Sequence, residues 1–106
     1  MVDLDHFKVV NDSLGHAAGD DYLVTVAERI KGSLRSIDRV GRFGGDEFVV
    51  VFADLPRVES LARLVDRLHR EVNEPTVVDG TEIMVRASIG AVAAPRGSDA
   101  DTVLAV

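Results

Sequence analysis

The stretch from Arg39 to Phe52, RVGRFGGDEFVVVF, constrains the fold more than any other part of the chain. Both of its arms are rich in valine and phenylalanine, which are enriched in β-strands. Gly44 and Gly45 interrupt this pattern, and two acids, Asp46 and Glu47, follow directly. Because glycine reaches positive φ cheaply, the stretch predicts a β-hairpin that turns at the glycines. An isolated turn of this kind is usually a solvated hairpin tip, so the rest of the chain must show whether the acids have a function.

Two longer segments have the period of an amphipathic helix. In residues 19–34 and again in residues 57–72, apolar side chains recur at steps of three and four, which places them on one face of a helix. Asp20 and Asp21 stand at the start of the first segment, where carboxylates suit the free N–H groups and the dipole of a helix N-terminus.

Short β-forming segments surround these helices. Residues 1–4 predict a strand, TVVDGTEIMV predicts a second hairpin that turns at Asp79-Gly80, and residues 86–94 predict a buried strand. Residues 98–106 open like another helix. The order β-α-β-β-α-β-β-β predicts an α+β fold with helices on one or both faces of a sheet. Since the first and last elements look cut, we expect a single domain, residues 1–106, that is truncated at both ends.

Composition limits the classes of function. The chain has 106 residues, of which 46% are apolar and 28% charged, as in an ordinary small globular domain. A net charge of −6 argues against partners such as nucleic acid or an anionic membrane. The longest apolar run, residues 48–53, is too short to span a bilayer. The absence of cysteine fits a reducing compartment, so we expect a cytoplasmic segment, whether or not a parent protein is membrane-anchored.

Polar side chains concentrate in residues 3–21, DLDHFKVVNDSLGHAAGDD. The D-x-D spacing invites comparison with a calcium loop, but Lys8 stands where that loop needs glycine and Leu14 where it needs glutamate. Asp3 remains a candidate metal ligand at the end of the first strand. A short helical turn is expected around Lys8 and Asn11, where each side chain alone would be an ordinary solvated residue.

Arg35 and Asp38, in RSID, lie just ahead of the hairpin. A guanidinium can pair with phosphate oxygens, or with O6 and N7 of guanine, in bidentate fashion. An arginine at a helix end can equally bond local carbonyl oxygens. Taken alone, the pair favours the second interpretation.

Together these segments resemble one known family. GGDEF, residues 44–48, is the name motif of the GGDEF family of diguanylate cyclases. Residues 3–21 resemble the family signature D-x-D-x-F-K-x-x-N-D-x-x-G-H-x-x-G-D, RSID is similar to its R-x-x-D product-inhibition motif, and SIGAVAA is similar to its late strand. The resemblance covers nearly the whole chain.

The resemblance implies a nucleotidyl-cyclase-like α+β fold, related to ferredoxin-like and polymerase-palm domains, with a mostly antiparallel sheet flanked by helices. It also implies an enzyme that condenses two GTP molecules into cyclic di-GMP and releases pyrophosphate. Each domain would hold one GTP, and two domains would meet in a homodimer.

The same resemblance implies roles for individual residues. Asp3, Asp46, Glu47 and the carbonyl of Leu4 would hold Mg²⁺ or Mn²⁺, hard ions that prefer oxygen ligands. The expected catalytic residues are Asp46, Glu47 and Lys8, with Lys8 offsetting triphosphate charge. The expected substrate-binding residues are Phe7, Asn11, Asp20, Arg42, Gly44 and Gly45.

Within that set, Asn11 and Asp20 would read guanine, and adenine would be rejected because it lacks the donor pair that a carboxylate accepts. The two glycines would let phosphates lie against the backbone. Arg42 would help to hold either the hairpin or the substrate. Arg35 and Asp38 would bind cyclic di-GMP at an inhibitory site.

The chain lacks two segments of the family pattern, one like LTGLxNRR upstream and one like ALYxAKxxGRN downstream, whose basic residues grip phosphates. Three alternatives therefore stay open beside an active cyclase: a non-catalytic module that binds GTP or cyclic di-GMP, an inactive part of a cyclase, and a structural or dimerising segment. The intact pair Asp46 and Glu47 argues against the first alternative, because silent members of the family commonly lose these acids.

Overall fold

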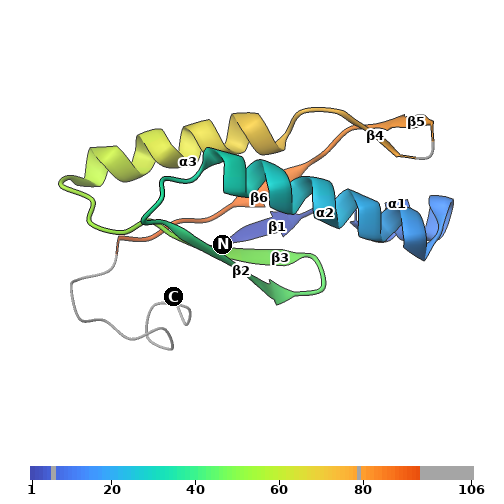
Figure 1. Ribbon diagram of the computed structural model, residues 1–106, viewed down its shortest axis with the longest axis horizontal. Helices are drawn as coiled ribbons and strands as arrows, with labels where there is room; N and C mark the ends of the chain where they lie inside the picture. Colours follow the sequence, from blue (N-terminus) through green and yellow to red (C-terminus); the bar gives the residue numbers. More distant parts are fainter. Residues whose placement is uncertain (6, 79, 94–106) are drawn as a thin grey trace.

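The structure is a computed structural model that describes residues 1–5, 7–78 and 80–93. The described chain contains three helices and six strands (Figure 1). In chain order they are β1 (Val2–Leu4), α1 (Phe7–Leu14), α2 (His16–Ser33), β2 (Arg39–Gly44), β3 (Glu47–Val51), α3 (Val58–Val72), β4 (Thr76–Val78), β5 (Thr81–Ile83) and β6 (Ala87–Ile89). The predicted α+β class and both predicted hairpins are confirmed.

Four strands form the main sheet, in the order β2-β3-β1-β6. All three pairings are antiparallel, and β1, although only three residues long, lies in the centre between β3 and β6. The other two strands, β4 and β5, form a separate antiparallel pair. This order brings the first residues of the chain beside the hairpin that follows some forty residues later.

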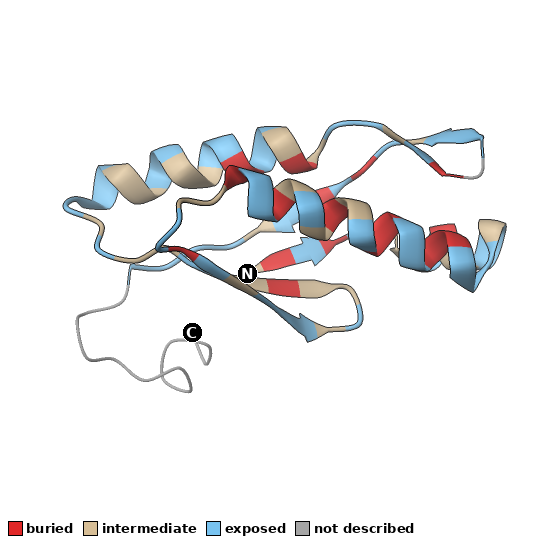
Figure 2. Ribbon diagram, in the orientation of Figure 1, coloured by how far each residue is buried: buried red, intermediate tan, exposed pale blue. Residues whose placement is uncertain are grey.

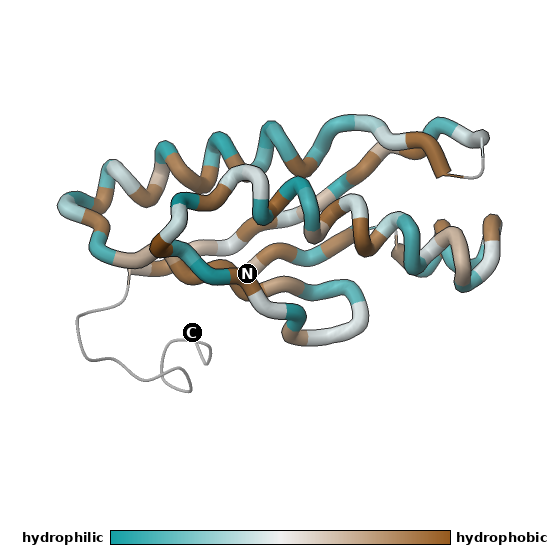
Figure 3. Tube along the Cα trace, viewed as in Figure 1, coloured by the Kyte–Doolittle hydropathy of each residue, from teal (hydrophilic) through white to brown (hydrophobic). Residues whose placement is uncertain are grey.

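The core lies on one face of the main sheet. Alternate residues of the sheet, Val2, Leu4, Phe48 and Ala87, are at most 5% exposed. They join one cluster with buried residues of α2 and α3, which are Tyr22, Leu23, Val26, Ile30, Leu68 and Val72. Figure 2 shows the buried stripes on these helices, and Figure 3 shows that the same stripes are the hydrophobic ones. The apolar residues that recur with helical period and those that alternate along the strands therefore pack into a single core.

The first long helix begins earlier than the sequence predicted. It starts at His16 rather than at residue 19, after Gly15, whose φ is 92°. Asp20 and Asp21 consequently lie in the second turn of α2 and do not cap its N-terminus. Glycine at position 15 makes the early start possible, because few other residues adopt a positive φ.

The last strand is shorter than expected. The sequence predicted a buried strand over residues 86–94, but β6 covers only Ala87–Ile89, and Ser88 and residues 90–93 are exposed. Residue 94 and the helix expected over residues 98–106 lie outside the described residues. Among the described residues, no helix is long and apolar enough to cross a bilayer.

Candidate active site

The register of β1 against β3 sets two of the predicted metal ligands, Asp3 and Glu47, opposite each other. Asp3 lies directly opposite Glu47, and the N–H of Leu4 donates to the carbonyl of Asp46 at 3.0 Å. The Asp3–Glu47 pair is therefore a non-hydrogen-bonded pair of the antiparallel ladder, the kind in which facing side chains come closest. Asp3 is exposed and Glu47 half-buried, on the face of the sheet that the helices leave uncovered.

This arrangement fits a small hard cation. Two facing carboxylates repel each other unless a positive charge lies between them, and Mg²⁺ is commonly held by one or two carboxylates together with substrate phosphates. Within the described residues, no group of three His, Asp or Glu side chains could enclose an ion. Two carboxylates alone would leave most coordination positions of such a cation to water and phosphate.

The predicted positive φ of the two hairpin glycines is not observed, and the two glycines differ from each other in their surroundings. Neither has a positive φ; among the described glycines only Gly15 and Gly80 do. At Gly44 a Cβ atom would lie 2.5 Å from Oε1 of Glu47, whereas a Cβ atom at Gly45 would meet nothing within 4 Å. Gly44 therefore gives room to the Glu47 carboxylate, and Gly45 leaves the backbone open to a ligand.

The predicted guanine-reading residues come together through a glycine. A Cβ atom on Gly19 would lie 1.7 Å from Oδ1 of Asn11, so the Asn11 amide rests directly against the backbone of α2. Asp20 is the next residue and is exposed. The Asn11 carboxamide therefore lies against the residue that precedes Asp20, at the junction of α1 and α2.

The sequence predicted Gly19 only as the first residue of a helical segment over residues 19–34. In the structure Gly19 lies inside α2 and is buried. Glycine in a helix interior costs about 1 kcal/mol relative to alanine, and this mismatch is the signal that could have identified a close contact.

The two remaining α1 residues differ in their surroundings. Lys8 is exposed and available to a ligand. Phe7 is half-buried, and its side chain packs against the core cluster. Phe7 therefore anchors α1 to the core, beside the exposed Lys8.

Arg42 lies at the end of β2 and bonds the turn itself. Its Nε donates to the carbonyl of Gly44 at 3.2 Å, and one terminal nitrogen donates to the carbonyl of Gly45 at 2.7 Å. The pairing with β3 shifts register between Arg42 and Gly44, and Phe43 between them is 59% exposed. Two roles were expected for Arg42, holding the hairpin or holding the substrate. These contacts correspond to the first role.

Arg35 and Asp38 form a closed ion pair. Nε of Arg35 lies 3.0 Å from Oδ2 of Asp38 and a terminal nitrogen lies 2.8 Å from Oδ1. The same arginine donates to the carbonyl of Ala53 at 2.6 Å, and the N–H of Ala53 donates back to Asp38 at 3.2 Å. Asp38 is 5% exposed. The hydrogen bonds from Arg35 hold the pKa of Asp38 below its usual value, and the Asp38 carboxylate raises the pKa of Arg35.

A contact that the sequence did not indicate joins the two ends of the described chain. The Ser88 hydroxyl, on β6, lies 3.0 Å from each carboxylate oxygen of Asp5. Asp5 directly follows β1, so this contact ties β6 to the end of β1. Nothing in the local sequence pairs residues 83 positions apart.

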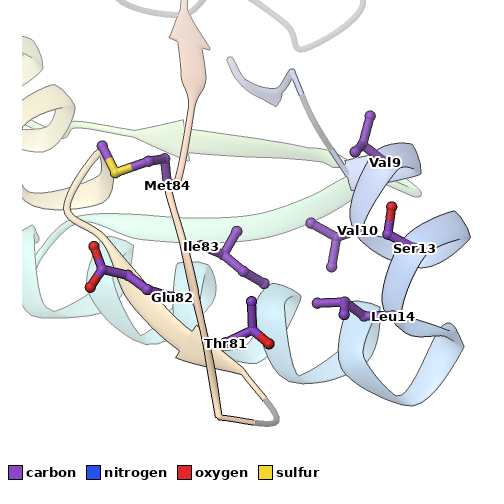
Figure 4. Close-up of a pocket in the computed structure, with 8 residues that line it drawn as sticks. All are labelled: Val9, Val10, Ser13, Leu14, Thr81, Glu82, Ile83 and Met84. Atoms are coloured by element: carbon purple, nitrogen blue, oxygen red, sulfur yellow. The ribbon is translucent and has the colours of Figure 1, made fainter.

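A groove of about 350 Å³ lies between α1 and β5. Figure 4 shows Val10 and Leu14 of α1 pointing across it toward Thr81 and Ile83. Val9, Ser13, Glu82 and Met84 complete its lining. None of the predicted site residues lines this groove, so the groove is separate from the candidate active site.

Comparison with known proteins places these features in a family. Residues 1–105 match the family model described as "Diguanylate cyclase, GGDEF domain". In Pseudomonas aeruginosa, diguanylate cyclase TpbB is 40% identical over 105 residues, which are 98% of this chain and 24% of TpbB. Cyclic di-GMP phosphodiesterase NbdA of the same species is 48% identical over 90 residues, 85% of this chain and 11% of NbdA.

A solved structure agrees with this assignment. Diguanylate cyclase SiaD of P. aeruginosa, in complex with its activator SiaC, superimposes with a TM-score of 0.89 at 30% identity over 98% of this chain and 40% of the SiaD chain. This chain thus spans less than half the length of each of these three proteins. The GGDEF motif at the β2–β3 turn, the match over residues 1–105 and the shared fold show that the chain belongs to the GGDEF-domain family of diguanylate cyclases.

Proposed function

We propose that this chain is the nucleotide-binding and catalytic part of a diguanylate cyclase. In the reaction, the 3′-hydroxyl oxygen of each GTP attacks the α-phosphorus of the other. In each of the two attacks, one new P–O bond forms and the bond from the α-phosphorus to the oxygen that bridges to the β-phosphate breaks. Two pyrophosphates and two protons leave in total, and cyclic di-GMP remains. Two chains facing each other would bring the two GTP molecules together. GTP as substrate favours a cytoplasmic location.

The register of β1 against β3 is the observation that carries the proposal. It sets Asp3 opposite Glu47 and ties Leu4 to Asp46, beside a turn whose second glycine is open to a ligand. Asp3, Asp46, Glu47 and the Leu4 carbonyl would hold Mg²⁺ or Mn²⁺. Bound there, the cation would neutralise phosphate charge and align the attacking oxygen.

The remaining residues have roles in binding GTP. Asn11 and Asp20 would bind the edge of guanine, for which the contact between Asn11 and Gly19 supplies the support. Lys8, exposed on α1, would offset the charge of the triphosphate. Asp46 is the acid nearest in sequence to the open turn and would accept the hydroxyl proton, directly or through water. Phe7 would support this surface from the core side.

The test uses the natural protein that carries this chain. Incubated with GTP and Mg²⁺, it should form cyclic di-GMP and pyrophosphate, detected by chromatography and mass spectrometry. Asp46→Asn should reduce product formation by at least about 100-fold, as expected for loss of a proton acceptor and ligand. Asp66→Asn, which changes an exposed acid on α3, is the matched control. GTP binding without product in the unchanged protein would favour a binding module, and no GTP binding would favour a structural role.

A second proposal concerns inhibition by product. Arg35 and Asp38 would bind the guanine edges of cyclic di-GMP, and the observation in favour is that the Arg35 side chain, although paired, remains 36% exposed. The Arg35 guanidinium already bonds Asp38 and the carbonyl of Ala53. Binding of cyclic di-GMP would therefore require Arg35 to exchange these partners for atoms of the ligand. Calorimetric titration of cyclic di-GMP into Arg35→Ala should show lost affinity; an unchanged affinity would eliminate this site.

A further inference from the structure

The guanidinium of Arg42 bonds two consecutive carbonyl oxygens of the Gly44-Gly45 turn, at 3.2 and 2.7 Å. Because a peptide unit is planar and trans, its N–H points opposite to its carbonyl. Holding the Gly44 and Gly45 carbonyls toward Arg42 therefore turns the N–H groups of Gly45 and Asp46 the other way. In the described ranges, the backbone hydrogen bonds of turns and loops include none donated by these two N–H groups.

The local structure gives Arg42 this reach. The register shift between Arg42 and Gly44 leaves Phe43 as an extra residue, 59% exposed, and such a bulge turns the strand locally. The planar fork of arginine can then serve both carbonyls at once, which the single ammonium of lysine cannot do in the same geometry.

We propose that Arg42 is a positioning residue that presents the N–H groups of Gly45 and Asp46 to the phosphates of the nucleotide. This inference rests on the proposed function, in which the phosphates lie against this turn. Two successive N–H groups that point the same way form a concave site for anions. Gly45 keeps that site open, since even an added Cβ atom would meet nothing within 4 Å there.

The first experiment needs no nucleotide. Amide ¹H–¹⁵N spectra of the free protein are recorded for Arg42→Lys and for Arg39→Lys. Arg39 is a matched control because it lies on the same strand and also donates to two backbone carbonyls, those of Ser36 and Asp38, at 2.9 Å each. In Arg42→Lys the Gly45 and Asp46 amide signals should move, because the turn loses contacts that orient these two peptide units, while Arg39→Lys leaves the signals in place.

The second experiment measures GTP affinity by calorimetry with Mg²⁺ present. Arg42→Lys should bind GTP about tenfold more weakly, a change on the scale of one hydrogen bond, and Arg39→Lys should stay within about twofold. Unmoved Gly45 and Asp46 signals in free Arg42→Lys would overturn the proposal and leave Arg42 as a direct phosphate contact. Moved signals with unchanged GTP affinity would overturn it as well. If the unchanged protein binds no GTP, the proposed function fails, yet the free-protein spectra still decide whether Arg42 sets the turn.

Discussion

At the scale of single residues, a change at Gly19 should affect the free energy of unfolding and the proposed GTP affinity differently. Replacing Gly19 with alanine places a methyl group where Oδ1 of Asn11 now lies, 1.7 Å from the Cβ position. The Asn11 amide is the end of a short side chain and can swing away, and alanine favours the helix by about 1 kcal/mol. We expect Gly19→Ala to keep or slightly raise the free energy of unfolding while GTP affinity falls at least about tenfold.

Gly32→Ala is the matched control for this change. Gly32 also lies in α2, but its added Cβ atom would meet nothing within 4 Å. It should gain up to about 1 kcal/mol of stability with no change in GTP affinity. Urea unfolding and calorimetry separate the two readouts. Loss of both stability and affinity in Gly19→Ala would mean that Asn11 cannot move, and unchanged GTP affinity would remove Asn11 from the site.

Asp38 gives the fold a dependence on pH. Its hydrogen bonds with Arg35 lower its pKa in the folded state, so its unfolded form, with an ordinary pKa of about 3.9, binds a proton more readily. The stabilisation is therefore complete above the unfolded pKa and is lost as pH falls through the lower, folded pKa. Unfolding free energies measured between about pH 7 and pH 3 should fall more steeply in the unchanged chain than in Asp38→Asn.

At neutral pH, Asp38→Asn should cost about 1–3 kcal/mol, since the backbone N–H of Arg35 and of Ala53 both donate to this carboxylate. The difference between the two proteins should shrink as the pH falls. Parallel pH profiles for the two proteins would show that the pair does not set the acid sensitivity.

At the scale of elements, Arg29 of α2 closes the end of α3. It donates to the carbonyls of Val72 at 3.1 Å, of Glu74, and of Pro75 at 2.7 Å. The last carbonyls of a helix lack partners within it, so this one side chain satisfies groups that would otherwise need water. It thereby fixes the direction in which the chain leaves α3 toward β4.

Arg29→Met keeps the aliphatic stem and removes the donors. We expect a loss of about 2 kcal/mol in the free energy of unfolding, within the range for hydrogen bonds to charged groups. Arg63→Met, on the exposed side of α3, should change it by less than about 0.5 kcal/mol. Equal unfolding midpoints in urea for the two variants would show that water replaces the Arg29 contacts without cost.

At the scale of the whole molecule, the helices cover one face of the sheet and the opposite face carries the acids. Asp3 and Glu47 lie on that second face with Val49 and Val51, and Val51 is 56% exposed. The candidate site therefore stands at the surface of the described chain, and the proposed ligands could approach it without any rearrangement of the core.

A cation held between Asp3 and Glu47 should stabilise the whole fold. If its dissociation constant is about 1 mM, about 10 mM Mg²⁺ adds roughly 1.4 kcal/mol to the free energy of unfolding. Thermal unfolding with and without Mg²⁺ should show this increase in the unchanged chain and not in Asp3→Asn. Asp66→Asn, the control, should keep it. A shift of equal size in all three proteins would indicate nonspecific binding of Mg²⁺ to an acidic chain.

The elements of this fold could be predicted because their signals are local. Steps of three and four gave α2 and α3, valine-rich runs gave β2 and β3, and the Asp79-Gly80 turn gave the β4–β5 pair. The early start of α2 was missed because it depends on the positive φ of Gly15, which hydrophobic period does not report. The predicted length of the last strand was wrong because apolar composition alone does not show where a neighbouring strand ends.

The sequence by itself determined the class of fold, the family and the identity of the acids and glycines at the turn. Only the tertiary structure decided that Asp3 faces Glu47, that Asn11 rests on Gly19, and that the Arg42 fork bonds the turn. The physical reason is that hydrophobic period reports which side of an element is buried, whereas contacts between elements depend on register and packing. Those two are set when the whole core closes.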